Sequence, residues 1–152
     1  MAPLIVLVAS LLTLRLLGLA LLAFADWPTD ARYAVALMLV LTASAHFAAS
    51  SRQELIQMVP SRLPRRAQLV TLTGVLELVA AGGLVLPMVA PFAGAGLVLL
   101  LIAMFPANVK AALENLPLRG KSATPLRFRL PLQVLFIAVT WWASQPTRLL
   151  AG

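Results

Sequence analysis

One stretch of this chain, residues 67–109, contains a single charged residue, Glu77. It is too long for one membrane-spanning helix of about 20 residues, and Pro87 and Pro91 divide it near its middle. This pattern indicates two apolar helices joined by a tight turn. The whole chain is 61% hydrophobic and 11% charged, whereas a typical soluble domain has about 25% charged residues. These features predict an all-α integral membrane protein.

Five segments are predicted to span the membrane: residues 4–25, 32–50, 67–87, 91–111 and 129–146. Residues 51–66 predict a short interfacial segment, because an apolar patch is followed by Pro60 and three arginines. We therefore expect one membrane domain over residues 1–152, with lipids as its immediate partners. A cleaved signal peptide is the alternative for the first segment. A retained helix is preferred, because the segment has no basic N-terminal region and carries Arg15 in its centre.

The net charge of +7 is not spread evenly. Most of the twelve Lys and Arg residues fall in or beside two inter-helix segments, with Arg52, Arg62, Arg65 and Arg66 in one and Lys110, Arg119, Lys121, Arg127 and Arg129 in the other. Clustering of this kind is the positive-inside signature of a membrane protein. It predicts a cytoplasmic N-terminus and an external C-terminus, and it argues against a nucleic-acid partner.

Polar side chains inside the apolar segments are the candidate functional residues. Hydrocarbon penalises such groups, so they should face inward and find partners. The predicted topology places Glu77 near the midplane and the others nearer the cytoplasmic side, except Arg15, which is central in its span. We expect one polar cluster with Glu77 at its floor and with Arg15 paired to Glu77 or to a ligand. The cluster would be formed by Arg15, His46, Glu77, Asn108 and Gln133, with Arg129 beside it.

Glu77 and His46 are the candidate catalytic residues, because a buried carboxylate and an imidazole can act as acid and base. The alternative is that both only hold helices together. Asn108, Gln133, Arg129 and Arg15 are candidate ligand-binding residues. The absence of cysteine excludes iron–sulfur clusters and thiolate chemistry within the chain, and one histidine excludes bis-histidine haem ligation by one copy. No metal site is predicted, because His46 and Glu77 alone supply too few ligands.

An ordered set of short motifs resembles the DoxX-like family of small bacterial membrane proteins. The motifs cover roughly residues 32–146 and are Ala45-His46-Phe47, Met58-Val59-Pro60, Leu63-Pro64, Gly74-Val75-Leu76-Glu77, Gly83-Leu84 with Pro87, Phe105-Pro106-Ala107-Asn108, Arg129-Leu130-Pro131-Leu132-Gln133 and Trp141-Trp142. The resemblance implies a four-helix core in the bacterial inner membrane, to which the N-terminal span is an addition. It also implies links to quinol-oxidising or oxidative-stress complexes.

Three functions are compatible with these features. The leading one is binding of an amphipathic molecule such as a quinone, as an accessory or subunit of a redox system. The second is a membrane enzyme that uses Glu77 and His46 for isomerase-like acid–base chemistry on a lipid-soluble substrate. The third is a non-catalytic scaffold. A transporter is less favoured, because five spans without an inverted repeat leave little room for alternating access.

Overall fold

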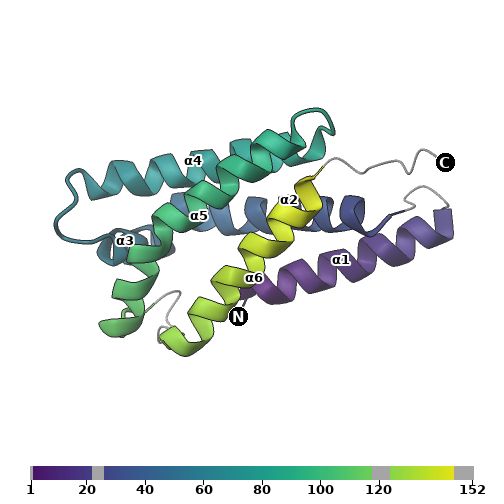
Figure 1. Cartoon of the computed structure of the whole chain (residues 1–152). Coiled ribbons are helices and arrows are strands. Elements are labelled where there is room, and N and C mark those ends of the chain that lie inside the picture. Colours follow the sequence, from purple (N-terminus) through teal and green to yellow (C-terminus); the bar gives the residue numbers. More distant parts are fainter. Residues whose placement is uncertain (1, 22–25, 118–123, 146–152) are drawn as a thin grey trace.

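The computed structural model describes residues 2–21, 26–117 and 124–145. These residues form helices and no strand, which confirms the predicted all-α class (Figure 1). Residues 22–25 and 146 of the predicted spans, together with Arg119 and Lys121, lie outside the described part of the chain. The helices are α1 (Ala2–Leu21), α2 (Trp27–Phe47), α3 (Ala49–Met58), α4 (Arg66–Val85), α5 (Ala90–Leu113) and α6 (Leu126–Ser144).

The second helix begins and ends earlier than its predicted span, 32–50. Asp26 caps α2 by accepting from the Thr29 amide at 3.0 Å, and Pro28 occupies the first turn, where a missing N–H costs nothing. The helix ends at Ala48, whose backbone is extended, and α3 leaves at 89° to α2. The predicted interfacial segment 51–66 is thus a helix over Ala49–Met58 followed by a turn, and it starts before residue 51.

Among the described helices, α1 (over Ala2–Leu19), α4 and α5 are long and apolar enough to cross a membrane. The pair α2–α3 meets the same criterion only when both helices are taken together across their bend. The helix α6 is absent from this set; Arg127, Arg129 and Gln133 lower its apolar content. Three spans, or four with the bent pair, are therefore supported by length and composition, and the chain has the features of a membrane protein.

The helix α2 lies at the centre of the bundle, where it contacts α1, α4 and α6 (Figure 1). The helices α5 and α6 pack on each other and cross the bundle obliquely. Large apolar side chains on α1, α4 and α5 point outward, among them Leu16, Val79 and Leu99, as expected for a surface in contact with lipid. The core is formed by Leu7, Ala34, Val35, Ala36, Met38, Leu39, Ala80, Ala81, Leu84 and Leu97.

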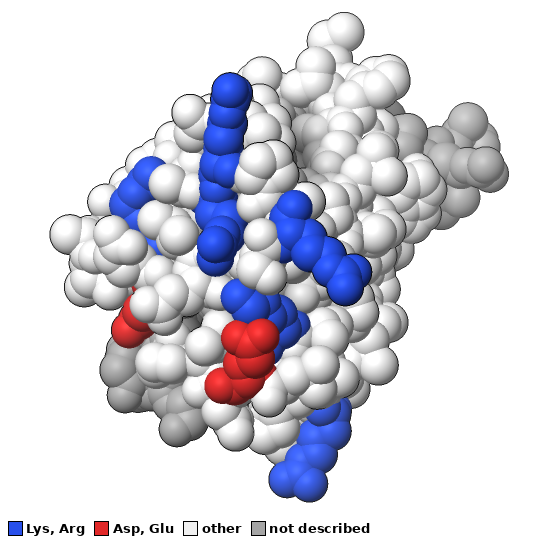
Figure 2. Space-filling view, turned by 90° about the vertical axis from the view of Figure 1, so that its left-hand side faces the viewer, with Lys and Arg blue, Asp and Glu red and all other residues white. Residues whose placement is uncertain are grey.

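Basic side chains gather on the end of the bundle that carries α3, as Figure 2 shows. The C-terminal part of α5 reaches the same end, because Lys110 Nζ donates to the carbonyl oxygens of Gln57 (2.6 Å) and Val59 (3.3 Å). These contacts satisfy carbonyls that the end of α3 leaves unpaired. The two basic segments recognised in the sequence therefore meet, at least in part, on one face.

Candidate functional site

His46 and Glu77 form a buried pair between α2 and α4. Their relative exposures are 5% and 6%, and His46 Nε2 lies 3.5 Å from Glu77 Oε1. Thr42, one turn before His46, donates from Oγ1 to Glu77 Oε2 at 3.1 Å. The other imidazole nitrogen, His46 Nδ1, lies 2.8 Å from the carbonyl oxygen of Val70. The structure thus brings the two candidate catalytic residues together.

The contact with Val70 fixes the tautomer of the imidazole. A carbonyl oxygen only accepts hydrogen bonds, so His46 Nδ1 must carry a proton and donate it. His46 Nε2 then faces a carboxyl oxygen. If the imidazole were neutral and Glu77 ionised, the lone pair of His46 Nε2 would face the negative Glu77 carboxylate in a buried site. The arrangement therefore requires one further proton, held either on His46 Nε2 or on Glu77 Oε1.

Small and hydroxylated residues of α4 make this close approach possible. A Cβ atom at Gly74 would lie 2.6 Å from His46 Cβ and 2.9 Å from His46 Cγ, so any larger residue must push α2 and α4 apart. Thr73 Oγ1 lies 3.2 Å from His46 Nδ1 and also donates to the Val70 carbonyl oxygen at 3.0 Å. Thr73 and Gly74, one turn before Glu77, thus allow α4 to pack closely on His46.

Arg52 positions the same region from α3. Its Nη1 atom donates to the carbonyl oxygen of His46 at 2.9 Å, a group left without a helical partner by the break at Ala48. Its Nη2 atom donates to the carbonyl oxygen of Ala67 (3.2 Å) and to Thr71 Oγ1 (2.9 Å) on α4. Arg52 therefore ties the end of α2 to the start of α4. In the sequence it is only one of several basic residues, and nothing marks it out.

Replacing Gly74 with alanine should disrupt this site. The added Cβ meets backbone-proximal atoms of His46, so relief requires helix displacement, and we expect a destabilisation of about 1–3 kcal/mol. Equilibrium unfolding in mixed micelles measures this. Gly82 lies on the same helix, and a Cβ there meets no atom within 4 Å. Gly82→Ala should therefore be neutral or slightly stabilising. Equal effects of the two substitutions would contradict the packing described here.

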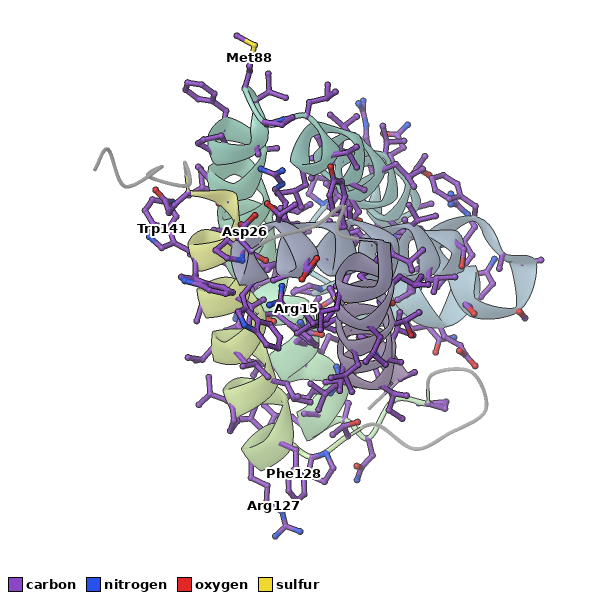
Figure 3. All side chains as sticks on the ribbon, turned by 90° about the vertical axis from the view of Figure 1, so that its right-hand side faces the viewer. Arg15, Asp26, Met88, Arg127, Phe128 and Trp141 are labelled. Atoms are coloured by element: carbon purple, nitrogen blue, oxygen red, sulfur yellow. The ribbon has the colours of Figure 1, made fainter. Side chains whose placement is uncertain are left out.

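Arg15 does not pair with Glu77, and that expectation is wrong. Arg15 Nη1 instead lies 3.2 Å from Asp30 Oδ2 on α2, and its guanidinium stacks over the Trp27 ring at 4.7 Å. Figure 3 looks at this end of the bundle and labels Arg15 on α1 and Asp26, the residue that caps α2. The physical reason is that α1 and α2 are consecutive helices, so residues equally far from their connection meet, whereas Glu77 contacts α2 near its opposite end. Asp30 is 1% exposed.

Asn108, Arg129 and Gln133 form a third polar group, between α5 and α6. Arg129 Nη1 donates to Asn108 Oδ1 at 3.0 Å, and Arg129 Nε donates to the carbonyl oxygen of Thr124 at 2.9 Å. Gln133 Nε2 donates to the carbonyl oxygen of Leu101 at 2.6 Å, in the turn of α5 that precedes Pro106. A proline weakens helical hydrogen bonding in the turn before it. Gln133 thus joins α6 to α5 in the turn before the proline.

The predicted single cluster is accordingly three separate groups. Within the described residues, no hydrogen bond or ion pair joins the Arg15–Asp30 pair, the His46–Glu77 pair and the Asn108–Arg129–Gln133 group. In the same part of the chain, no three His, Asp or Glu side chains lie close enough to hold a metal ion. Sequence reasoning missed Thr42, Arg52 and Asp30.

Two of the hollows on the described part of the surface bear on the site, and neither is lined by His46 or Glu77. One, of about 510 Å³, lies at the basic end between the turn after α3 and the C-terminal part of α5, and is lined by residues that include Arg62 and Lys110. The other, of about 380 Å³, is an apolar groove between α4 and α5. Its lining begins at Leu76, the residue next to Glu77.

Comparison with known proteins gives a family but no relative of established function. No curated protein and no solved structure matches the chain. One family model, described as Domain of unknown function (DUF8561), matches residues 35–144. The match includes the His46–Glu77 pair and the Asn108–Arg129–Gln133 group, and it leaves out Arg15 and Asp30. Because the match covers most of its length, the chain belongs to the DUF8561 family.

Proposed function

We propose that this chain is a DoxX-like protein of the bacterial inner membrane that binds an amphipathic small molecule, with a quinone as the specific case. The head group would lie at the His46–Glu77 pair, and the protein would serve as an accessory or subunit of a redox system. The observation that carries the proposal is the buried contact of His46 Nε2 with Glu77 Oε1, beside the contact of His46 Nδ1 with the Val70 carbonyl oxygen. Buried ionisable groups within a membrane are costly and usually functional.

The pair has the hydrogen-bonding chemistry that a quinone head group needs. A quinone carbonyl oxygen accepts a hydrogen bond, and the proton between His46 Nε2 and Glu77 Oε1 supplies one. A quinol hydroxyl donates, and the Glu77 carboxylate or the unprotonated His46 Nε2 accepts. The 3.5 Å separation of the two atoms is longer than an ordinary N–H···O hydrogen bond, so the pair is held less tightly than its neighbours.

The proposed topology has five spans, with the basic end in the cytoplasm. The collection of basic side chains beside α3 supports this orientation under the positive-inside rule (Figure 2). The 89° bend supports α3 as a surface helix if α2 crosses the bilayer. The 19 residues of α6 extend about 28 Å, close to the thickness of the hydrocarbon core, which is the basis for counting α6 as the fifth span. Packing of α1 on α2, with Leu7 in the core, supports retention of the first span.

A scaffold with a structural polar core is the second candidate. It is favoured by one observation, that the polar candidates already bond to protein atoms: Asn108 to Arg129, and Gln133 to the Leu101 carbonyl oxygen. On this alternative, the His46–Glu77 pair only joins α2 to α4, and a substitution that keeps the bundle intact leaves function unchanged.

Quinone titration of the purified protein separates the two candidates. We expect saturable binding of a long-chain benzoquinone to the wild type, weakened by about tenfold or more in Glu77→Gln and in His46→Gln through loss of a charge-assisted hydrogen bond. Glu114→Gln is the matched control, because Glu114 is the exposed C-cap residue of α5 and pairs with Lys110 one turn earlier. Absent binding in the wild type, or equal binding in all variants, would remove the quinone proposal and favour the scaffold.

A further inference from the structure

The groove between α4 and α5 is built to hold a hydrocarbon chain. Every residue that lines it is apolar or a glycine, so it offers no polar side chain to a ligand. Its α4 wall includes Leu76, Ala80 and Gly83, and its α5 wall includes Phe92 and Gly96. The outer end lies beside Met88, which projects from the α4–α5 turn at the edge of the bundle (Figure 3).

The groove is too small for a whole helix to lie inside it. One turn of an α-helix with its side chains is a cylinder 10–12 Å wide and 5.4 Å long, or roughly 400–600 Å³. The groove holds about 380 Å³ in total, less than a single turn. A single alkyl or isoprenoid chain is much narrower. The groove therefore fits one flexible chain that lies along the two helices.

The groove lies beside the head-group site along α4, although Glu77 itself faces α2 and does not line it. Its inner wall starts at Leu76, directly before Glu77, and includes Ala80, one turn after Glu77. From there it extends along α4 towards Gly83 and the turn into α5, away from the basic end. We propose that this groove binds the hydrocarbon tail of the amphipathic molecule whose head group lies at the His46–Glu77 pair. The inference rests on the proposed function and adds the tail site to it.

Two glycines make a matched test possible. Gly96 lines the groove, and a Cβ at this position meets no atom within 4 Å, so a leucine side chain at this position starts in open space and occupies part of the groove. Gly82 also has open space but does not line the groove, so Gly82→Leu is the control with the same gain in helix propensity. Gly83 is unsuitable, because its Cβ would lie 2.7 Å from Ala93 Cβ.

The experiment uses a benzoquinone whose hexadecyl chain carries a photoactivatable diazirine, added to the full-length protein in lipid nanodiscs. Crosslinks are mapped by mass spectrometry. We expect labelling to concentrate on groove residues such as Val79 and Phe92 over the comparably exposed Leu12 and Leu16 of α1. Gly96→Leu should lower groove labelling about tenfold, as expected if two methylene groups lose their burial, and Gly82→Leu should not.

Three results would overturn the tail assignment. They are labelling spread evenly over α1, α4 and α5, groove labelling unaffected by Gly96→Leu, and equal groove labelling by a phosphatidylethanolamine that carries the same diazirine chain.

The head-group proposal is tested by separate results. If Glu77→Gln leaves groove labelling unchanged while Gly96→Leu removes it, the groove is a tail site and the head group lies elsewhere. If quinone binding depends on Glu77 and not on Gly96, only the groove assignment is wrong.

Discussion

Replacing Asp30 with alanine is expected to be among the most destabilising substitutions in this chain, at about 3 kcal/mol, because it leaves Arg15 without its buried counter-ion. Asp30 is 1% exposed, and it is the only acidic residue in the first turn of α2, where the helix dipole also favours a negative charge. Stacking of Arg15 on Trp27 remains in the variant, but a cation–π contact is worth only about 1–2 kcal/mol. Equilibrium unfolding in mixed micelles measures the loss.

The paired substitution Arg15→Leu with Asp30→Leu provides the critical comparison. Removing both charges removes the desolvation penalty together with the attraction, so the double variant should lie within about 1 kcal/mol of the wild type. Asp26→Ala is the matched single control; it loses the N-cap of α2 and the hydrogen bond from Thr29 Oγ1, and should cost about 1 kcal/mol. A double variant as unstable as Asp30→Ala would show that Arg15 and Asp30 do not stabilise each other.

Glu77→Ala and Glu77→Gln are expected to have very different effects on stability. Alanine leaves His46 Nε2 without a partner in a buried site and leaves a cavity beside it, whereas Thr42 Oγ1 keeps the Leu39 carbonyl oxygen as an acceptor at 3.1 Å. The lost partner and the cavity together should cost about 2–4 kcal/mol. Glutamine has the same shape, and its amide donates to the unprotonated His46 Nε2 while its oxygen accepts from Thr42. We expect Glu77→Gln to stay within about 1 kcal/mol of the wild type. The Glu77→Gln variant should nevertheless lack the shared proton, because an amide does not exchange a proton with His46 as a carboxyl group does.

Thermal and denaturant unfolding of the two variants, run beside ligand binding, separates the role in folding from the role in function. A glutamine variant that is folded but no longer binds ligand is the expected result. If Glu77→Gln is as unstable as Glu77→Ala, the negative charge itself holds α2 to α4, which would favour the scaffold. If both variants are as stable as the wild type, the pair described here does not contribute to packing.

The helices could be predicted from sequence because their signals are local. Pro91 starts α5, and the apolar stretches around Glu77 and after Pro91 agree with α4 and α5 to within a few residues. The end of α2 could not be found in this way. The residues from Ala43 to Ser51 contain neither glycine nor proline, and the break at Ala48 is held by Arg52, whose side chain reaches His46, Ala67 and Thr71 on two other helices.

The candidate site was only partly predictable, because depth in a membrane does not determine which residues meet. Glu77, His46, Asn108, Arg129 and Gln133 all bond across helices, as their position in apolar segments indicates. Depth alone made Arg15 and Glu77 look like partners. Their actual partners depend on helix order and rotation, which place Asp30 against α1 and His46 against α4. The contact between Gly74 and His46 required both helix faces to be known.

Nitrogen-15 NMR of the imidazole tests the central claim, the shared proton of the His46–Glu77 pair, most directly. His46 is the only histidine, so labelling histidine with ¹⁵N gives one Nδ1 and one Nε2 signal for the protein in nanodiscs. We predict a protonated Nδ1 in every condition. The Nε2 signal should change in Glu77→Gln, because this nitrogen either loses its proton or exchanges a carboxyl donor for a weaker amide donor, and it should not change in Glu114→Gln. An unprotonated Nδ1, or an Nε2 signal that ignores Glu77→Gln, would contradict the account.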